Sequence, residues 1–437
     1  MKAYKLIIRS FILVFICFTN ANAQEVLTLE AAIKVALENN YEIKISKNEL
    51  KIDQSNVAIG NAGMLPKVTA NVVNNNNTQN TTQTRQDGTI NKLDNAKNNS
   101  LTYGVGLDWT VFDGFKMFAK LDQLKALQKL GESELKLTII TKISDVSATY
   151  FDLVQQQQQL SALDTTIVIS NQRLNLAQSR YTIGKASKLE VLNAEVDLNT
   201  DTTTLLRQKE LYANTKTLLN QLLARDINTE FKVIDIIVVD DKLLLPELSK
   251  LAQNMNPQLQ SQVLNKKIAE LQLKQIKGDR YPVVKLNSGY NFAETESSLG
   301  FVSQSSSKGL NYGFSASLNI FNGFAQRRNE KIAKIQLDNS TLAVEQQNQL
   351  LASTLTTSYQ TYQTNLELSK LEDKNEVIAK QNLAITLDKF KIGTITTLEF
   401  RTAQLNYINA KVRKSNTLFQ AKLSEIALKE LAGNLSF

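Results

Sequence analysis

The sequence predicts a mainly helical protein with a membrane β-barrel portion, in which long coiled-coil helical hairpins are combined with four β-strands per chain. Three observations lead to this fold class. The chain is an internal duplication, both halves contain long stretches almost free of glycine and proline, and each half has a segment in which apolar and polar residues alternate. These patterns favour long packed helices and strands with two different faces.

The N-terminal residues 1–23 have the plan of a signal peptide. Three basic residues precede an apolar run over 11–18, and the small residues Ala21 and Ala23 stand before the expected cleavage point. The run is shorter than the ~20 residues that cross a bilayer as a helix. We therefore expect 1–23 to be removed on export together with Cys17, the only cysteine, although the cleavage point itself is left open.

The composition argues against an enzyme and against a metal site. Histidine is absent from the whole chain, and export would leave no cysteine. These residue types supply most metal ligands and many catalytic bases. A glycosidase with paired carboxylates is the remaining catalytic reading, but no acidic pair lies at a strand end or loop of a compact domain. We predict no catalytic residue, no metal and no cofactor, and the dispersed net charge of +8 gives no reason to expect nucleic acid as a partner.

Two motifs recur 209 residues later in the chain. The frame Ile-Gly-x-x-x-x-Leu-Glu occupies 183–190 and 392–399, and Phe-Asp/Asn-Gly-Phe occupies 112–115 and 321–324. Long repeats of this kind usually indicate pseudo-symmetric assembly. We expect the first repeat at 24–224, the connector at 225–245 and the second repeat at 246–437.

Each repeat is expected to contain one very long helix that ends at the Ile-Gly frame. Apolar residues recur every seven positions from Ile139 to Tyr181 and from Leu398 to Ile426, which is the spacing of a coiled-coil seam. A helix of about 67 residues at ~1.5 Å per residue is ~100 Å long, far more than the width of a small domain. These helices should build a rod or a tube.

Two shorter helices accompany each long one. They are expected at roughly 29–62, 188–224, 246–279 and 396–432. Each pair sums to about 70 residues, so two short helices stacked end to end would match one long helix. Gly184 and Gly393 should reverse each long helix into the next short one, because glycine accepts the backbone conformation of a tight reversal.

A pair of strands is expected over 66–112 and another over 282–321. In the better defined strand of each pair, apolar side chains alternate with small or polar ones. The apolar side chains that we expect to face lipid are Tyr103, Val105, Leu107, Trp109, Tyr312 and Phe314. The polar segments 74–100 and 294–308 are expected to connect the strands of each pair.

A half-buried soluble sheet would show the same alternation. Here the long helices leave at the strand ends, where Asp113 and Asn322 are the expected N-caps, so no element is left to cover the apolar face. Strands of about ten residues also suit a tilted crossing of a bilayer. Because four strands cannot close a barrel and open edges are not tolerated in lipid, several chains must pool their strands, and a trimer would supply twelve.

With its two hairpin-tip frames, its paired Phe-Asp/Asn-Gly-Phe motifs, and Pro66 and Pro282 at the strand starts, the sequence resembles the TolC family of outer-membrane efflux and secretion channels. The resemblance covers nearly the whole exported chain. It implies a homotrimer with one twelve-stranded barrel in the outer-membrane lipid of a Gram-negative-type bacterium and a twelve-helix tube in the periplasm. It also implies a passive exit duct for substrates that an inner-membrane transporter delivers through a periplasmic adaptor protein, with the connector in a belt around the tube.

The resemblance further implies roles for residues at the tips. The adaptor-contact residues would be Ile183, Gly184, Lys185, Ile392, Gly393 and Thr394. The periplasmic gate would contain Glu190, Glu399, Arg401, Thr402 and Phe390. Phe390, Ile395 and Thr402 stand where the best-known members have a tyrosine, an arginine and a second acid, so we expect a weaker polar latch and a more apolar constriction. Arg401 is expected to offset part of the charge of Glu399.

Alternatives stay open at this point. A secreted or surface coiled-coil protein without a conduit would explain the heptads, but not the duplicated strands and tips. The tip glycines could serve the turn alone, and the glutamates could be ordinary solvated side chains. The sequence does not identify the transported substrate or the class of pump, RND, ABC or MFS, that a channel of this kind would serve.

Overall fold

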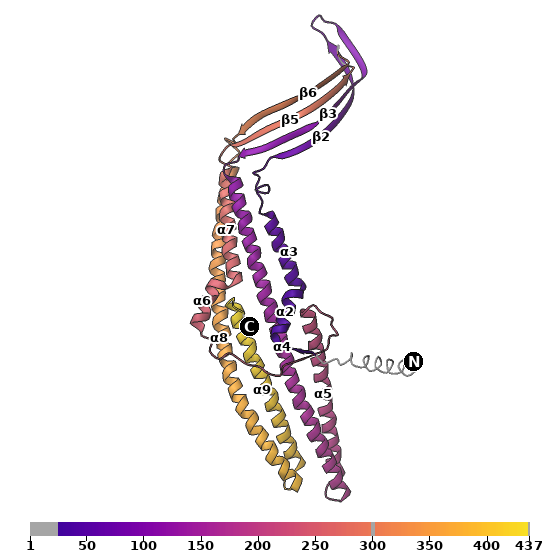
Figure 1. Ribbon diagram of the computed structural model, residues 1–437, viewed down its shortest axis with the longest axis vertical. Coiled ribbons are helices and arrows are strands. Elements are labelled where there is room, and N and C mark those ends of the chain that lie inside the picture. Colours follow the sequence, from indigo (N-terminus) through magenta and orange to yellow (C-terminus); the bar gives the residue numbers. More distant parts are fainter. Residues whose placement is uncertain (1–24, 299–301, 436–437) are drawn as a thin grey trace, which may run out of the picture. The chain divides into compact units, whose positions relative to one another are not determined.

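The computed structural model describes residues 25–298 and 302–435 (Figure 1), so the expected signal peptide lies outside the described residues. The elements, in chain order, are β1 (Glu25–Leu27), α2 (Leu29–Asn39), α3 (Tyr41–Asn56), β2 (Lys67–Thr84), β3 (Ile90–Phe112), α4 (Lys116–Thr182), α5 (Lys188–Leu222), β4 (Phe231–Val233), α6 (Leu245–Met255), α7 (Pro257–Gly278), β5 (Val283–Ser297), β6 (Gln304–Ser317), α8 (Ala325–Ile392) and α9 (Thr397–Leu431).

The chain forms two compact units, and each draws residues from both halves of the sequence. The helical unit consists of Met1–Lys47, Glu134–Leu259 and Asn348–Phe437. The sheet unit consists of Asn48–Ser133 and Gln260–Gln347. The duplication therefore does not correspond to two separate bodies.

The two very long helices predicted from the sequence are present. α4 has 67 residues and α8 has 68 residues. Across the described residues, no helix combines the length and the apolar character needed to cross a membrane. The prediction of one continuous helix over 29–62 and another over 246–279 is wrong, because each range contains two helices. In the first range the second helix, α3, already ends at Asn56.

The first of these breaks is made by Asn40, whose side chain joins three helix ends. Its Oδ1 accepts hydrogen bonds from the N–H groups of Glu42 (2.9 Å) and Ile43 (3.3 Å) at the start of α3. Its Nδ2 donates to the carbonyl oxygen of Leu222 at the end of α5 (2.9 Å). The first N–H groups and the last carbonyl groups of a helix have no partner inside that helix. The buried amide of Asn40 bonds to N–H groups of one helix and to a carbonyl group of another.

Asn256 repeats this arrangement in the second half of the chain. Its Oδ1 accepts from the N–H of Leu259 in α7 (2.9 Å), and its Nδ2 donates to the carbonyl oxygen of Leu431 in α9 (3.0 Å). The end of α5 thus meets the start of α3, and the end of α9 meets the start of α7. This is the end-to-end stacking that the matched helix lengths predicted.

The N-terminal strand and the connector meet on α4 in the helical unit. β1 pairs in parallel with β4, and each strand has only three residues, too few for a recognisable alternation in the sequence. The buried Tyr150 hydroxyl donates to the carbonyl oxygen of Leu27 (2.9 Å) and accepts from the N–H of Ile234 (3.2 Å). Burial raises the pKa of Tyr150 above its ordinary value. The surrounding core includes Val146, Leu153, Leu219, Phe231 and Ile426.

Further along the connector, buried polar side chains bind its backbone to α8 and α9. The N–H of Asp240 donates to the carboxylate of Glu425 (2.9 Å), and the hydroxyl of Tyr362 donates to the carbonyl oxygen of Asp240. Glu425 is 1% exposed and also accepts from Lys422 (2.9 Å) and Lys429 (2.7 Å). Burial, together with the nearby charge of Asp240, raises the pKa of Tyr362 to about 12.

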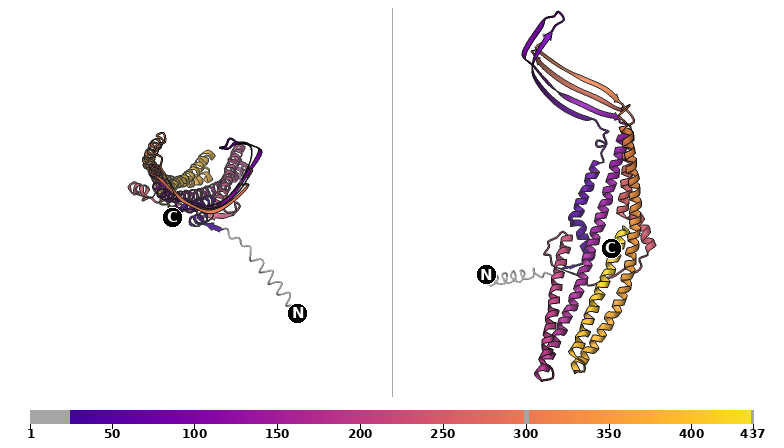
Figure 2. Two further views of the ribbon diagram at one scale, coloured as in Figure 1. Left: turned by 90° about the horizontal axis from the view of Figure 1, so that it is seen from above. Right: turned by 180° about the vertical axis from the view of Figure 1, so that it is seen from behind.

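The sheet unit contains a curved, antiparallel four-stranded sheet with the order β2-β3-β5-β6 (Figure 2). The prediction that 74–100 and 294–308 only connect strands is wrong, because most of these polar residues pair within the strands themselves. Backbone hydrogen bonds continue the ladder there without an apolar face. At the other end, β6 stops at Ser317, short of the predicted 321.

The Phe-Asp/Asn-Gly-Phe motifs lie between the sheet strands and the long helices. Asp113 Oδ1 accepts a hydrogen bond from the N–H of Met117 (3.2 Å), and Asn322 Oδ1 accepts one from the N–H of Gln326 (3.3 Å). Both side chains therefore cap the start of a long helix, as predicted.

Asn40→Asp tests the double role of the asparagine bridges. The substitution keeps the oxygen that caps α3 but removes the donor to the end of α5. We expect it to lower the free energy of unfolding by about 1–3 kcal/mol, measured by thermal unfolding of the purified protein. The same substitution at the exposed Asn339 is the control, and equal unfolding midpoints for the two variants would contradict the bridging role.

The residues that follow α5 and α9 provide a matched pair of tests. Ala224 has a φ of 49°, whereas the equivalent Gly433 has a φ of 70°. Because a left-handed backbone strains a residue with a side chain, Ala224→Gly should raise the free energy of unfolding by about 1 kcal/mol. Gly433→Ala should lower it, since the new Cβ would also collide with the carbonyl oxygen of Met255. Changes in the same direction for both variants would contradict this account.

Candidate functional site

Both hairpins reverse through a turn that requires glycine. Gly184 has a φ of 71° and Gly393 a φ of 82°. The N–H of Lys185 donates to the carbonyl oxygen of Arg180 (2.7 Å), the N–H of Gly184 donates to the carbonyl three residues before it (3.0 Å), and Gly393 and Thr394 make the same two bonds. This pair of bonds is the Schellman motif, which ends α4 and α8 in the same way.

Large apolar side chains are exposed at equivalent positions of the two tips. Ile183 and Ile392 are 66% and 75% exposed, and Leu189 and Leu398 are 64% and 76% exposed. Matched exposure of large apolar side chains in both repeats is typical of a surface that meets a partner. The six residues expected to contact an adaptor, Ile183, Gly184, Lys185, Ile392, Gly393 and Thr394, all lie at these two reversals.

The acidic residues that follow the tips have different partners. The carboxylate of Glu399 accepts from the N–H of Thr396 (3.2 Å), whose hydroxyl accepts from the N–H of Glu399 (3.2 Å), which is a capping box. The carboxylate of Glu190 instead accepts from the hydroxyl of Thr397 (2.6 Å) and lies 4.0 Å from Arg180. Glu190 therefore connects the two hairpins, whereas Glu399 is bound to its own helix.

Phe390 lies in a small apolar core near the second tip. It is 1% exposed and stacks on Phe400 at 4.8 Å between ring centroids, with Leu383 in the same cluster. Arg180 of the first hairpin lies over the ring of Phe390 (4.9 Å) and donates to its carbonyl oxygen (2.7 Å). Thr402 is exposed and, together with Glu399, lines a groove between α8 and α9.

Arg401 forms an ion pair with Asp201, which was not predicted, and its expected offset of the charge of Glu399 stays a prediction. Its two terminal nitrogens donate to the two oxygens of Asp201 at 2.8 Å each, and its Nε lies 3.7 Å from Asp197. Both Arg401 and Asp201 are more than nine-tenths buried. Burial alone would lower the pKa of Arg401, but the hydrogen bond to Asp201 and the charges of Asp201 and Asp197 together raise the pKa above its ordinary value.

Other polar side chains extend this pair into a clasp between the hairpins. Ser170 on α4 donates to Asp201 (2.6 Å), and Gln404 on α9 donates to Ser170 (2.9 Å). Arg173, also on α4, donates to Asp197. We call Ser170, Arg173, Asp197, Asp201, Arg401 and Gln404 the hairpin clasp. It binds the helices of the first hairpin to α9 of the second.

Sequence reasoning missed most of the hairpin clasp and the bridging role of Arg180. The acids at 197 and 201 are one helical turn apart and interrupt an otherwise apolar seam, which was the available signal. Their partners on α9 lie about 200 residues away in the chain, so spacing alone could not identify them.

The side chains expected to face lipid share one face of the sheet. Residues that stand opposite each other on paired strands point to the same face. The rows across the strands are Val72, Tyr103, Phe292 and Lys308; Ala70, Val105, Tyr290 and Leu310; Val68, Leu107, Ser288 and Tyr312; and Trp109, Leu286 and Phe314, so the one charged member, Lys308, lies in the row furthest from the helices. The rings of Tyr103 and Phe292 stack at 5.0 Å, and Tyr312 and Phe314 are 82% and 79% exposed. The opposite face carries Asn71, Gly104, Asn291 and Gly309 in one row.

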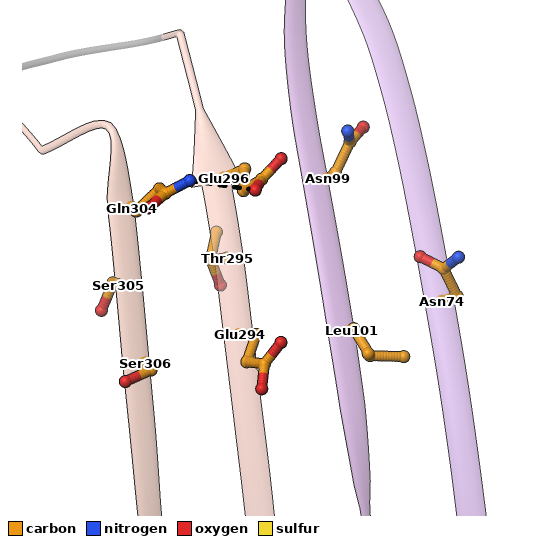
Figure 3. Close-up of a pocket in the computed structure, with 9 residues that line it drawn as sticks. All are labelled: Asn74, Asn99, Leu101, Glu294, Thr295, Glu296, Gln304, Ser305 and Ser306. Carbon is orange, nitrogen blue, oxygen red and sulfur yellow. Dashed lines mark hydrogen bonds between the residues drawn. The ribbon is translucent and has the colours of Figure 1, made fainter.

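The apolar face becomes polar toward the far end of the sheet. A cavity of about 490 Å³ there is lined by Asn74, Asn99, Leu101, Glu294, Thr295, Glu296, Gln304, Ser305 and Ser306 (Figure 3). The amide of Gln304 donates to Glu296 (3.1 Å). In the part of the chain that the structure describes, no group of three or more side chains could hold a metal ion.

Comparison with known proteins places this geometry in a family. A family model described as outer membrane efflux protein matches residues 32–225 and 248–434, leaving between them the region where the connector was expected. The outer membrane efflux protein BepC of Brucella suis biovar 1 (strain 1330) is 22% identical over 173 residues. That alignment covers 40% of this chain and 35% of BepC, so it spans only about a third of this relative.

Solved outer-membrane channels share the fold. The Campylobacter jejuni CmeC outer membrane channel superposes with a TM-score of 0.80 at 16% identity, over 93% of this chain and 85% of that one. The outer membrane protein VceC from Vibrio cholerae superposes with a TM-score of 0.75 at 16% identity, over 93% and 96% of the two chains. These likenesses confirm the predicted fold class, and the matching family model confirms the resemblance to a family of outer-membrane efflux channels. Because one family model matches both halves over most of the sequence, the chain belongs to the outer membrane efflux protein family and is located in the outer membrane.

Proposed function

We propose that this protein is the outer-membrane channel of a tripartite efflux or type I secretion system. It acts as a passive exit duct for substrates that an inner-membrane transporter delivers through a periplasmic adaptor protein. The observation that carries the proposal is the combination, in one chain, of a sheet with an apolar face and two helical hairpins with matched exposed tips. The adaptor and the transporter follow from the resemblance to the TolC family, and the substrate is left open.

The dimensions of the sheet support its placement in lipid. The apolar face follows β3 from Tyr103 to Phe112, nine steps of ~3.3 Å, or ~30 Å. A strand tilted by about 40° would cross ~23 Å with this length, close to the ~25 Å apolar band of outer-membrane barrels. β2 and β6 are the outer strands of the sheet order within the described residues. Unpaired strand edges are strongly unfavourable in lipid, so a homotrimer that closes a twelve-stranded barrel satisfies them.

The hairpin tips are the proposed contact surface for the adaptor. Their isoleucine and leucine side chains supply apolar anchors, and the glycines let the backbone turn tightly beneath them. The polar residues differ between the repeats, since Lys185 and Lys188 of the first tip correspond to Thr394 and Thr397 of the second. The two tips are therefore expected to contribute unequally to adaptor binding.

The gate is proposed to lie at the same end of the hairpins. Glu190 connects the hairpins at the tips, Arg180 lies 4.0 Å from Glu190 and over the ring of Phe390, and the hairpin clasp binds the hairpins further from the tips. Three copies of Glu190 around a trimer axis would attract cations. The charge of Glu190 is partly offset by Arg180 at 4.0 Å, whereas the capping box leaves Glu399 charged, so both carboxylates contribute to this field in our proposal.

Substitution of the apolar tip residues tests the adaptor contact. We expect Ile183→Ser combined with Ile392→Ser to reduce the amount of adaptor that copurifies with the channel by at least about tenfold, as the loss of two interface anchors would. Trimer formation and channel conductance should be unchanged, because both side chains are exposed in the folded chain. Ile378→Ser, at a 63% exposed position higher on α8, is the control. Normal copurification with the double variant would rule out the tips as the contact.

Removal of the buried charge of Arg401 tests the gate. Arg401→Gln leaves Asp201 buried without its cationic partner, which typically destabilises the local structure by about 3–5 kcal/mol. The hairpins should separate more readily, so single-channel conductance in planar bilayers should increase. Lys380→Gln removes the same charge from an exposed position of the second hairpin and should conduct like the unmodified protein. Unchanged conductance of Arg401→Gln would mean that the hairpin clasp does not hold the gate.

A further inference from the structure

Exposed aromatic side chains gather where the strands of the sheet lead into the long helices. Phe115, Phe118, Tyr281, Phe321 and Phe324, which we call the aromatic collar, are all more than half exposed. The rings of Phe115 and Tyr281 lie 6.3 Å apart, and those of Phe321 and Phe324 lie 5.3 Å apart. Clusters of exposed aromatic residues are typical of a surface that is covered in the working state of the protein.

Two members of the aromatic collar are held in a strained backbone conformation. Phe115 has a φ of 65° and Phe324 a φ of 64°, a region that bulky side chains rarely adopt. The strain occurs at the same position of both repeats. It brings no burial to either ring, since they are 54% and 69% exposed. Packing within the chain therefore does not account for these residues.

A row of cations follows the collar on α8. Arg327, Lys331 and Lys334 recur at the i, i+4 and i+7 positions of one helix stripe, with Arg328 beside them, and all four are exposed. None of them forms an ion pair within the described ranges. The nearby Glu330 already binds Arg280 at 2.7 Å.

Arg327 and Arg328, which lie in the first turn of α8, also oppose the dipole of their own helix. The first turn of α8 contains no acidic residue, although the positive end of a helix favours acids and disfavours bases. A local preference that is broken in this way indicates a function for the residues involved. The first turn of α4 also contains no acidic residue, but its Lys116 is paired with Asp279 at 2.7 Å, and the half-buried Lys120 donates to Gln123 at 3.2 Å.

The spacing between the collar and the cations matches a membrane interface. Arg327, Arg328 and Lys331 follow Phe324 by three to seven residues, or ~5–10 Å along a helix. The polar layer on each side of a bilayer is ~5–8 Å thick, and arginine and lysine side chains extend several ångströms along their own length. Lys334, at ~15 Å, lies beyond this layer.

We propose that the aromatic collar, together with Arg327, Arg328 and Lys331, binds the head groups of anionic phospholipids in the periplasmic leaflet of the outer membrane. The aromatic rings lie at the boundary of the hydrocarbon, and the three cations bind lipid phosphates, which guanidinium groups can engage with two bonds. The inference rests on the proposed function, because it requires the apolar sheet face to be embedded in that membrane. It predicts one strong lipid site per chain, at the second repeat.

The test uses the full exported chain reconstituted in nanodiscs of phosphatidylethanolamine with a minor fraction of phosphatidylglycerol. Native mass spectrometry after mild delipidation counts the lipids that each channel retains. The unmodified protein should retain phosphatidylglycerol in excess of its share. The variant R327Q/R328Q/K331Q should lose this excess by at least about tenfold, given the attraction expected for each basic residue near an anionic surface.

The variant K370Q/K374Q/K380Q is the matched control, because it removes the same charge from exposed positions ~70 Å further along α8. It should retain phosphatidylglycerol like the unmodified protein. Phe324→Gly removes the ring and relieves the backbone strain, so it should lower retention without lowering the unfolding temperature.

Undiminished excess of phosphatidylglycerol in R327Q/R328Q/K331Q, or an equal loss in the control variant, would overturn the lipid site. Failure of the unmodified protein to enter nanodiscs at all would instead contradict the proposed function. The two failures are therefore distinguishable.

Discussion

The bridge that a single asparagine side chain makes between helix ends underlies the helical architecture of this protein. A long helix such as α4 needs a partner of similar length, and two shorter helices can provide one only if their facing ends are joined without unsatisfied backbone groups. Asn40 and Asn256 supply that joint in the two repeats, each with one acceptor and one donor. The hairpins, their tips and the hairpin clasp all depend on the continuous helix pairs that result.

The two repeats keep one backbone plan and assign different chemistry to it. Both tips use the same glycine turn, but Glu190 reaches the other hairpin while Glu399 caps its own helix. Both long helices begin after a left-handed phenylalanine, but the first turn of α8 carries Arg327 and Arg328, whereas the first turn of α4 carries Lys116 paired with Asp279. In our proposals the two halves therefore share one backbone geometry and divide the binding, gating and membrane contacts between them.

Much of this fold could be predicted because its elements are long and their patterns are local. The 67- and 68-residue helices, the turn glycines and the apolar sheet face each follow from residue type and period. The breaks at Asn40 and Asn256 were not predicted, because the side chains that make them bind carbonyls of residues 222 and 431, far away in the chain. The polar ends of the strands were missed for another reason: backbone bonds form them, and these leave no apolar pattern. The hairpin clasp was missed because its partners on α5 and α9 are also far apart in the chain. In the sequence alone, its charged residues look like ordinary surface residues.

The connector has a mechanical consequence. Tyr362 and Glu425 bind its backbone to α8 and α9 through buried hydrogen bonds, so the helices are held at that level. From Tyr362 to Gly393 the helix runs 31 residues, a lever of ~45 Å. A swing of only ~10° about the connector would displace a tip by ~8 Å, several atomic diameters. In the proposed channel, a modest bend at the level of the connector would thus be enough to open the gate to a small solute.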